Sequence, residues 1–106
     1  MKEILKKIGN TPLFNVSDIF VKAEYFNPSG SIKDRIAFQM IKDALKKNKN
    51  IKGFVEATSG NTGISLSFIS SVLGYKFVAV MPENASIERT KIIRHYGGEV
   101  VYSPCQ

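Results

Sequence analysis

Residues 53–63 read Gly53-Phe54-Val55-Glu56-Ala57-Thr58-Ser59-Gly60-Asn61-Thr62-Gly63, a short strand that runs directly into a glycine-rich polar loop. Residues 64–73 follow this loop without a charge and predict a helix that is covered on most sides. Gly74 is placed to end that helix in a left-handed conformation. The apolar run 76–81 then predicts a strand buried on both faces, as in a parallel sheet, and Pro82 stops it.

Helix and strand alternate on both sides of this segment. Apolar side chains at positions 36, 37, 40, 41, 44 and 45 predict a helix over residues 32–47 with one buried stripe. Ser86 can cap a helix running to about Tyr96, with Ile92 and Ile93 pointing inward, and residues 99–102 predict one more strand. The alternation predicts an α/β fold, a three-layer αβα arrangement around a parallel sheet.

The two ends of the sequence carry weaker signals. Residues 9–12 indicate a turn, and residues 20–25 alternate loosely and predict a strand. The last predicted strand has no helix after it to cover the sheet, so we expect a truncated fold, cut from a larger α/β protein.

Bulk properties place the sequence among ordinary globular domains. Its 106 residues allow one domain at most, and 43% are hydrophobic and 23% charged. No apolar run approaches the length of about 20 residues needed to cross a bilayer, and the start lacks the features of a signal peptide. The single cysteine, Cys105, cannot form an intramolecular disulfide, so we expect a cytoplasmic protein.

The net charge of +6 raises the question of nucleic-acid binding. The sequence has no Arg-rich helix, no aromatic stacking platform and no nucleic-acid motif, so this function is disfavoured. The clustered lysines indicate a solvated helix end and loop. They are Lys42, Lys46, Lys47, Lys49 and Lys52.

The loop 58–63 has the composition of an anion site. Its glycines permit close backbone approach to a ligand, and a loop that opens a helix points several N–H groups at one spot. Thr58, Ser59 and Thr62 add hydroxyl donors, while Asn61 offers both a donor and an acceptor. The alternative is that these are only capping and turn residues. The P-loop lysine and the dinucleotide-binding glycine spacing are both missing.

Lys33 is the candidate nucleophile. Ser31 and Asp34 fit a capping box, which places Lys33 at the second helical position. The positive end of a helix dipole disfavours an ammonium group there, and a neutral amine attacks aldehydes. The alternative is a surface lysine beside a surface Asp34–Arg35 ion pair.

Four motifs in this order resemble the cysteine synthase/cystathionine β-synthase family of pyridoxal-phosphate enzymes, which have fold type II. The resemblance covers nearly the whole sequence. The motifs are Gly9-Asn10-Thr11-Pro12-Leu13, then Lys22-x-Glu24-x-x-Asn27-Pro28-Ser29-Gly30-Ser31-x-Lys33-Asp34-Arg35, then Glu56-x-Thr58-Ser59-Gly60-Asn61-Thr62-Gly63, and finally Met81-Pro82-Glu83 with Ser86-x-Glu88-Arg89.

This resemblance implies a cofactor, a reaction and partners. Lys33 would be the catalytic lysine that holds pyridoxal 5′-phosphate covalently and moves the proton at the substrate α-carbon. Asn61 would bond the cofactor 3′ oxygen. The reaction would replace the β-substituent of O-acetylserine by sulfide to give L-cysteine, and a homodimer and a serine acetyltransferase partner are implied. The α-carboxylate of the amino acid would be gripped by Thr58, Ser59, Gly60, Asn61 and Thr62.

The family's phosphate-binding loop and the residue facing the pyridine nitrogen come from a later half that this sequence lacks. The resemblance divides the sequence into an N-terminal segment, 1–31, that packs partly with that half, and an incomplete mobile αβα subdomain, 32–106. We therefore expect the chain alone to bind the cofactor weakly or not at all, and to be inactive.

Other functions remain open. Glu56-Ala57-Thr58 in place of a Glu-Pro-Thr sequence leans toward the B-type cysteine synthase branch. O-phosphoserine, or serine with homocysteine, are other substrates, and an amino-acid dehydratase or a threonine synthase are other activities of this fold. A non-catalytic interaction module that pairs through its uncovered sheet is a third class.

Two further sets of residues point to packing. His95 and Cys105 stand alone and suggest no metal site. The aromatic residues Tyr25, Phe26, Phe38 and Phe68 are expected in the core rather than in stacking roles.

Overall fold

The computed structural model describes residues 2–104 and contains two sheets. The parallel sheet has the order β3-β4-β5, and β1 and β2 form a separate antiparallel pair. The predicted α/β fold, a parallel sheet flanked by helices, is confirmed, and Cys105 lies outside the described residues. The elements are η1 (Glu3–Lys7), β1 (Leu13–Val16), β2 (Ile19–Lys22), η2 (Glu24–Phe26), α1 (Lys33–Lys47), β3 (Gly53–Ala57), α2 (Asn61–Leu73), β4 (Lys76–Pro82), α3 (Ile87–His95) and β5 (Glu99–Ser103).

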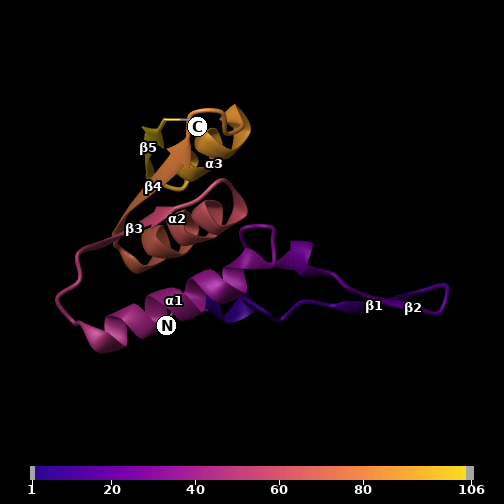
Figure 1. Ribbon diagram of the computed structural model, residues 1–106. Helices are drawn as coiled ribbons and strands as arrows, with labels where there is room; N and C mark the ends of the chain where they lie inside the picture. Colours follow the sequence, from indigo (N-terminus) through magenta and orange to yellow (C-terminus); the bar gives the residue numbers. More distant parts are fainter. Residues whose placement is uncertain (1, 105–106) are drawn as a thin grey trace.

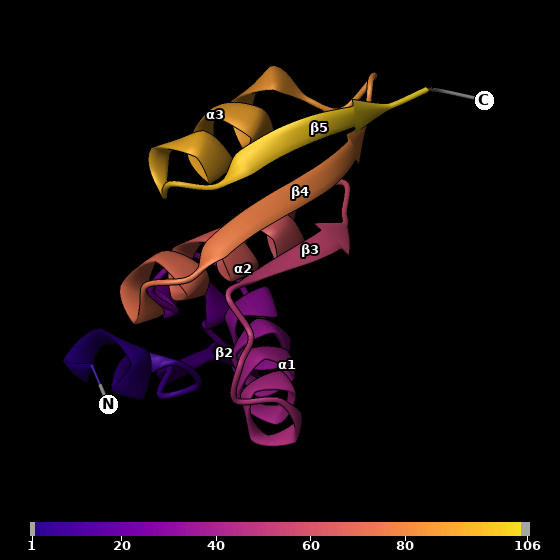
Figure 2. The same cartoon turned by 90° about the vertical axis from the view of Figure 1, so that its left-hand side faces the viewer.

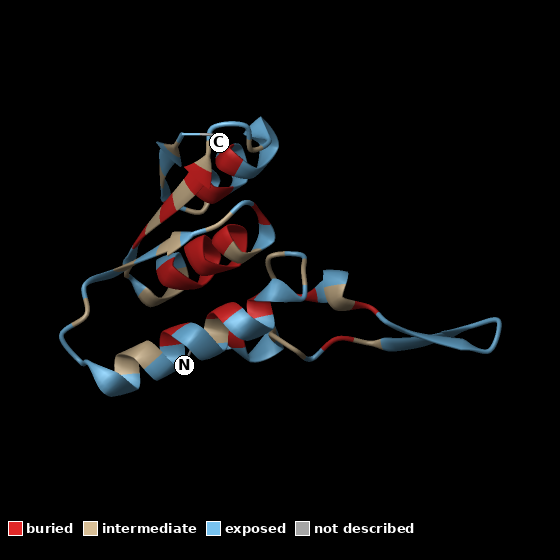
Figure 3. Cartoon of the chain, viewed as in Figure 1, coloured by how far each residue is buried: buried red, intermediate tan, exposed pale blue. Residues whose placement is uncertain are grey.

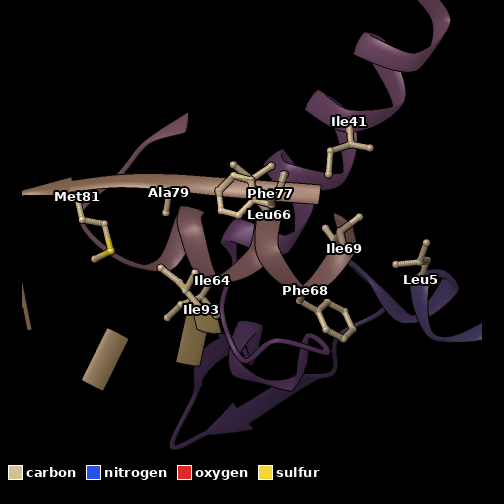
Figure 4. Close-up of a cluster of buried hydrophobic side chains, with 11 residues drawn as sticks. Leu5, Ile41, Ile64, Leu66, Phe68, Ile69, Phe77, Ala79, Met81 and Ile93 are labelled. Carbon is tan, nitrogen blue, oxygen red and sulfur yellow. The ribbon is translucent and has the colours of Figure 1, made fainter. Parts of the chain in front are cut away.

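The core lies between β4 and the helices. Right-handed connections advance from β3 to β4 to β5, so α2 and α3 lie on the same side of the strands and contact each other (Figure 2). Phe77, Ala79 and Met81 alternate along β4 and face this side, where they meet Ile69 of α2 and Ile93 of α3 (Figure 4). Helix α1 packs against α2, so α2 is enclosed on most of its surface (Figure 1).

Helix α2 is largely buried, which confirms the prediction made from its lack of charged residues. Every residue from 63 to 70 is buried, and Gly74 ends the helix at φ 84° as predicted (Figure 3). Its predicted start at residue 64 is wrong, because α2 begins at Asn61. The Thr58 hydroxyl accepts hydrogen bonds from the N–H groups of Gly60 (3.3 Å) and Gly63 (3.0 Å), which caps the first turn from outside the helix.

The start of α1 also differs from the prediction. The helix begins at Lys33, its N-cap is Ile32, and the Ser31–Asp34 capping box is wrong. The Asp34 carboxylate accepts instead from the Ser29 N–H (2.8 Å) and the Ser29 hydroxyl, while the Ser31 hydroxyl accepts from the Lys33 N–H (3.2 Å). Lys33 is therefore the first helical residue and still lies in the first turn.

The N-terminal segment forms a hairpin, and the strand predicted over residues 20–25 is present but ends earlier, because β2 spans Ile19–Lys22 and η2 begins at Glu24. β1 and β2 pair through Ser17 and Asp18, whose φ angles of 50° and 65° suit a tight primed turn. The hairpin projects from the rest of the chain (Figure 1), and all eight of its strand residues are exposed (Figure 3).

Several packing predictions can now be compared with the structure. Phe68 is buried and Phe38 is half-buried against the core, but Tyr25 and Phe26 are exposed. Ile93 is fully buried, whereas Ile92 is exposed because it lies on the outer side of α3. The clustered lysines of α1 and the following loop are all exposed, as predicted. Within residues 2–104, no helix combines the length and apolar character that a membrane span requires.

Candidate active site

Lys33 and the polar loop after β3 meet in one open pocket of about 620 Å³. Parallel strands present their carboxyl ends at one edge of the sheet, and the loop leaves β3 at that edge. Helix α1 crosses α2 and brings its N-terminal turn to the same place. The pocket is lined by Lys33, Ile36, Met40, Glu56, Ala57, Thr58, Ser59, Gly60, Asn61, Thr62 and Arg89.

The loop is held at both ends. The Thr58 N–H donates to the Val80 carbonyl oxygen at 2.9 Å, which continues the pairing of β3 with β4 into the loop. The first bond inside α2 runs from the Ile64 N–H to the Gly60 carbonyl, so the N–H groups of Asn61 and Thr62 receive no partner from the helix itself. Free N–H groups at a helix N-terminus favour an anion.

A buried polar network fixes the turn that carries Lys33. Ser29 and Asp34 bond each other, and the Ser29 hydroxyl lies 3.2 Å from the Ser65 hydroxyl of α2. Asp34 and Ser65 are fully buried, whereas Lys33, which precedes Asp34 and lines the pocket, is exposed. The first turn of α1 is thus anchored to α2 through the residue next to Lys33.

A second network holds the same turn from the N-terminal side. The Arg35 guanidinium donates to both carboxylate oxygens of Glu24 and, at 3.0 Å, to the carbonyl of Gly9. The Thr11 hydroxyl donates to Glu24 at 2.6 Å. The Arg35 hydrogen bond, with help from Thr11, lowers the pKa of Glu24 to about 2. These residues come from the turn at 9–12 and the motif at 22–35.

The structure also adds pocket residues that had no predicted role in the site. Arg89 reaches the loop from α3, and Ile36 and Met40 form an apolar wall one and two turns after Lys33. The spacing of Ile36 and Met40 from Lys33 would have revealed this wall, because positions three, four and seven apart share a helix face. The position of Arg89 depends on tertiary packing.

Metal chemistry finds no support in the described part of the chain. Across residues 2–104, no group of three or more His, Cys, Asp and Glu side chains is placed to hold a metal ion. His95 lies in the last turn of α3, as expected.

The donor set of the pocket suits a carbonyl ligand and an anion instead. An exposed primary amine lies in one pocket with an amide side chain and the free N–H groups of a helix N-terminus. The fold and the site therefore define an α/β protein whose pocket combines a primary amine with the anion-favouring N-terminus of a helix. The sequence matches the pyridoxal-phosphate dependent enzyme family over residues 4–104, and the chain belongs to this family.

Among named proteins, this chain is similar to cysteine synthases and to an O-ureido-L-serine synthase. Cysteine synthase B of Campylobacter jejuni is 50% identical, over 97% of this chain and 36% of the relative. O-ureido-L-serine synthase of Streptomyces lavendulae is 44% identical, over 95% of this chain and 34% of the relative. The chain therefore spans about a third of the length of these relatives.

Solved structures give the same result for the fold. A crystal structure of an O-ureido-L-serine synthase superposes with a TM-score of 0.89 at 43% identity, covering 98% of this chain and 36% of the other. Cysteine synthase from Entamoeba histolytica gives 0.88 at 36% identity, covering 98% and 35%. The fold is thus part of a fold type II pyridoxal-phosphate enzyme.

Proposed function

We propose that this chain supplies the catalytic lysine and the carboxylate-binding loop of a cysteine synthase. The observation that carries the proposal is that Lys33 and residues 58–62 line the same pocket. The reaction is a β-replacement, in which sulfide displaces the acetate of O-acetylserine and L-cysteine is formed. Relatives named cysteine synthase, at 46–50% identity, support this choice.

The cofactor of the family, pyridoxal 5′-phosphate, acts as an electron sink for the bond that breaks at the amino-acid α-carbon. Lys33 would hold it covalently, and its amine would then take and return the α-proton. Asn61 would bond the 3′ oxygen of the ring, a role that suits an amide with a donor and an acceptor.

The loop would bind the amino acid by its carboxylate. The backbone N–H groups of Asn61 and Thr62 and the hydroxyls of Thr58 and Ser59 are donors on one side of the pocket. Ile36 and Met40 would add apolar surface to the lining of the pocket. Gly60 completes the set assigned to the carboxylate.

The assembly around this pocket is part of the same proposal. We assign residues 1–31 to packing with a cofactor domain, and residues 32–106 to the mobile subdomain. The phosphate of the cofactor would be bound outside this chain, because no other helix within residues 2–104 follows a segment with the repeated glycines of 58–63. A cytoplasmic homodimer with serine acetyltransferase as partner completes the assignment.

A chimera tests the function directly. In it, this chain replaces the homologous segment of the Campylobacter jejuni relative, and cysteine formation from O-acetylserine and sulfide is measured. We expect turnover, and we expect it to be lost in the Lys33→Ala chimera but kept in Lys47→Ala, an exposed lysine on the same helix. A chimera that folds, retains the cofactor and makes no cysteine would contradict the proposal.

Alternative substrates are resolved in the same assay. O-phosphoserine, O-ureidoserine and serine with homocysteine are offered in place of O-acetylserine, because relatives include an O-ureido-L-serine synthase and an O-acetylserine dependent cystathionine β-synthase. Ammonia released from serine or threonine would indicate a dehydratase.

A further inference from the structure

Arg89 connects α3 to the loop that follows β3. It is the third residue of α3, and its own N–H is capped by the Ser86 hydroxyl at 3.4 Å. Its Nη1 donates to the Ser59 carbonyl oxygen at 3.2 Å. Arg89 is therefore a cation of the pocket that reaches the loop from another element.

The peptide between Ser59 and Gly60 is held from two sides. Arg89 binds its carbonyl oxygen, and the Thr58 hydroxyl accepts its N–H at 3.3 Å. With both polar groups engaged, this peptide plane cannot rotate without losing a hydrogen bond. The N–H groups that follow it, at Asn61 and Thr62, keep their direction as a result.

Gly60 is shaped to this contact. Its φ of −178° lies outside the left-handed region, and the contact is read from the space around its Cα. A Cβ at this position would lie 2.8 Å from Cζ of Arg89 and 2.9 Å from both Nε and Nη1. Three guanidinium atoms at nearly equal distance show that the flat group lies face-on against the loop, which a side chain on Gly60 would prevent.

We propose that Arg89 is a positioning and specificity residue. It fixes the Ser59–Gly60 peptide so that the loop presents its N–H groups to an amino-acid carboxylate, and Gly60 is glycine because it must admit the guanidinium. The substrate part of this proposal rests on the proposed function, but the Arg89–Gly60 contact does not.

The contact is tested in the 106-residue chain by a double-mutant cycle. Gly60→Ala, Arg89→Ala and the double variant are compared by urea unfolding, with circular dichroism to verify folding. If a side chain at position 60 clashes with Arg89, Gly60→Ala lowers the folding equilibrium constant while Arg89 is present. When Arg89 is already alanine, we expect this reduction to be at least about tenfold smaller. Additive effects would overturn the contact.

Amide hydrogen exchange gives a second readout in the same chain. Arg89→Met keeps the length and removes the charge, and we expect the amides of Gly60 and Gly63, which donate to Thr58, to exchange about tenfold faster, while those of β4 stay unchanged. Arg94→Met, an exposed arginine near the end of α3, serves as the matched control. Loop exchange that is equal in Arg89→Met and Arg94→Met would also overturn the proposal.

The substrate role is measured in the chimera. We expect Arg89→Met to raise KM for the amino-acid donor about tenfold or more, with a smaller effect on kcat, since the loop binds the carboxylate before and during reaction. Arg89→Lys should recover only part, because an ammonium cannot lie flat on the loop. An unchanged KM would overturn the substrate role. A chimera inactive with every donor would refute the proposed function, and the cycle and exchange results would still decide the contact.

Discussion

Arg35 and Glu24 form a two-point ion pair, with Nε 2.5 Å from Oε1 and Nη2 3.0 Å from Oε2. The pair joins the first turn of α1 to η2, two residues after Lys33. Bidentate geometry of this kind fixes both position and orientation. The ion pair is therefore a structural link between the N-terminal segment and the turn that carries the candidate nucleophile.

The first prediction concerns acid stability. The pKa of Glu24 is lowered from 4.5 to about 2, first by the hydrogen bond from Arg35. A lowered pKa in the folded state stabilises the fold above pH 4.5, and this contribution is lost as the pH falls toward 2. The difference in unfolding free energy between wild type and Glu24→Gln should be constant above pH 4.5 and shrink below it.

Glu3→Gln is the control for this experiment. Its side chain is 87% exposed and pairs with Lys6 at 3.0 Å. Exposed pairs contribute little, so its effect should be small at every pH. Urea unfolding from pH 2 to 7 measures both variants, and a Glu24→Gln difference that ignores pH would refute the prediction.

The second prediction concerns the buried carboxylate of Asp34. Asp34→Ala leaves the Ser29 N–H without its acceptor and should cost about 1–3 kcal/mol of unfolding free energy. Asp43→Ala, on the exposed side of the same helix, removes a hydrogen bond from Gln39 and should cost much less. Urea unfolding of both variants checks the difference, and equal losses would mean that the Ser29–Asp34–Ser65 network is not a structural anchor.

The sequence predicted the parallel half of the fold because burial there is encoded locally. A helix without charges has to be covered, and the alternation of such segments with apolar strands allows few topologies. The position of the 58–63 loop at a ligand edge followed from the same logic, since the loop leaves the carboxyl end of a parallel strand. That Lys33 shares a pocket with residues 58–62 was implied only by the resemblance to the family.

The missed features depend on contacts between distant residues or on weak turn signals. The hairpin turn uses Ser17 and Asp18 at positive φ, without the glycine that usually marks such a turn. Two serines that precede Asp34, Ser29 and Ser31, both fit a cap, and only the packing of Ser29 against Ser65 decides between them. The hydrogen bond from Arg89 to the Ser59 carbonyl oxygen depends on the packing of α3 next to the loop, so no local sequence pattern predicts it.

The third prediction concerns close packing at Gly63. A Cβ there would lie 2.6 Å from Cγ2 of Thr58, so Gly63→Ala should cost about 1–3 kcal/mol through overpacking. Thr58→Ser removes the clashing methyl group but keeps the hydroxyl that caps α2. The double variant should therefore be more stable than Gly63→Ala alone.

Gly74→Ala provides the comparison for this rescue. Nothing lies within 4 Å of a Cβ at Gly74, but its φ of 84° disfavours alanine. Its cost is conformational, so Thr58→Ser should not relieve it. Rescue of Gly74→Ala, or no rescue of Gly63→Ala, would contradict the packing argument when unfolding midpoints are compared.

The fourth prediction concerns the exposed apolar hairpin. Ile19 and Phe20 are 66% and 68% exposed, and apolar surface of this extent favours association. The isolated chain should self-associate, which light scattering detects as an apparent mass above that of a monomer. Phe20→Lys should lower this apparent mass. Gln39→Lys, an exposed position on α1, adds the same charge and should leave the mass unchanged. A monomeric wild type would count against an interaction module.

The last prediction compares cofactor retention by the isolated chain with cofactor retention by the chimera. The isolated chain offers an amine and an amide to pyridoxal phosphate, but its phosphate would be bound outside this chain. After dialysis the chain should therefore retain little absorbance of lysine-bound cofactor, whereas the chimera should retain it. Borohydride reduction followed by peptide mapping should label Lys33 in the chimera, and the Lys33→Ala chimera should lose this label and its absorbance. Strong absorbance retained by the isolated chain would show that residues 1–106 already form a sufficient cofactor site.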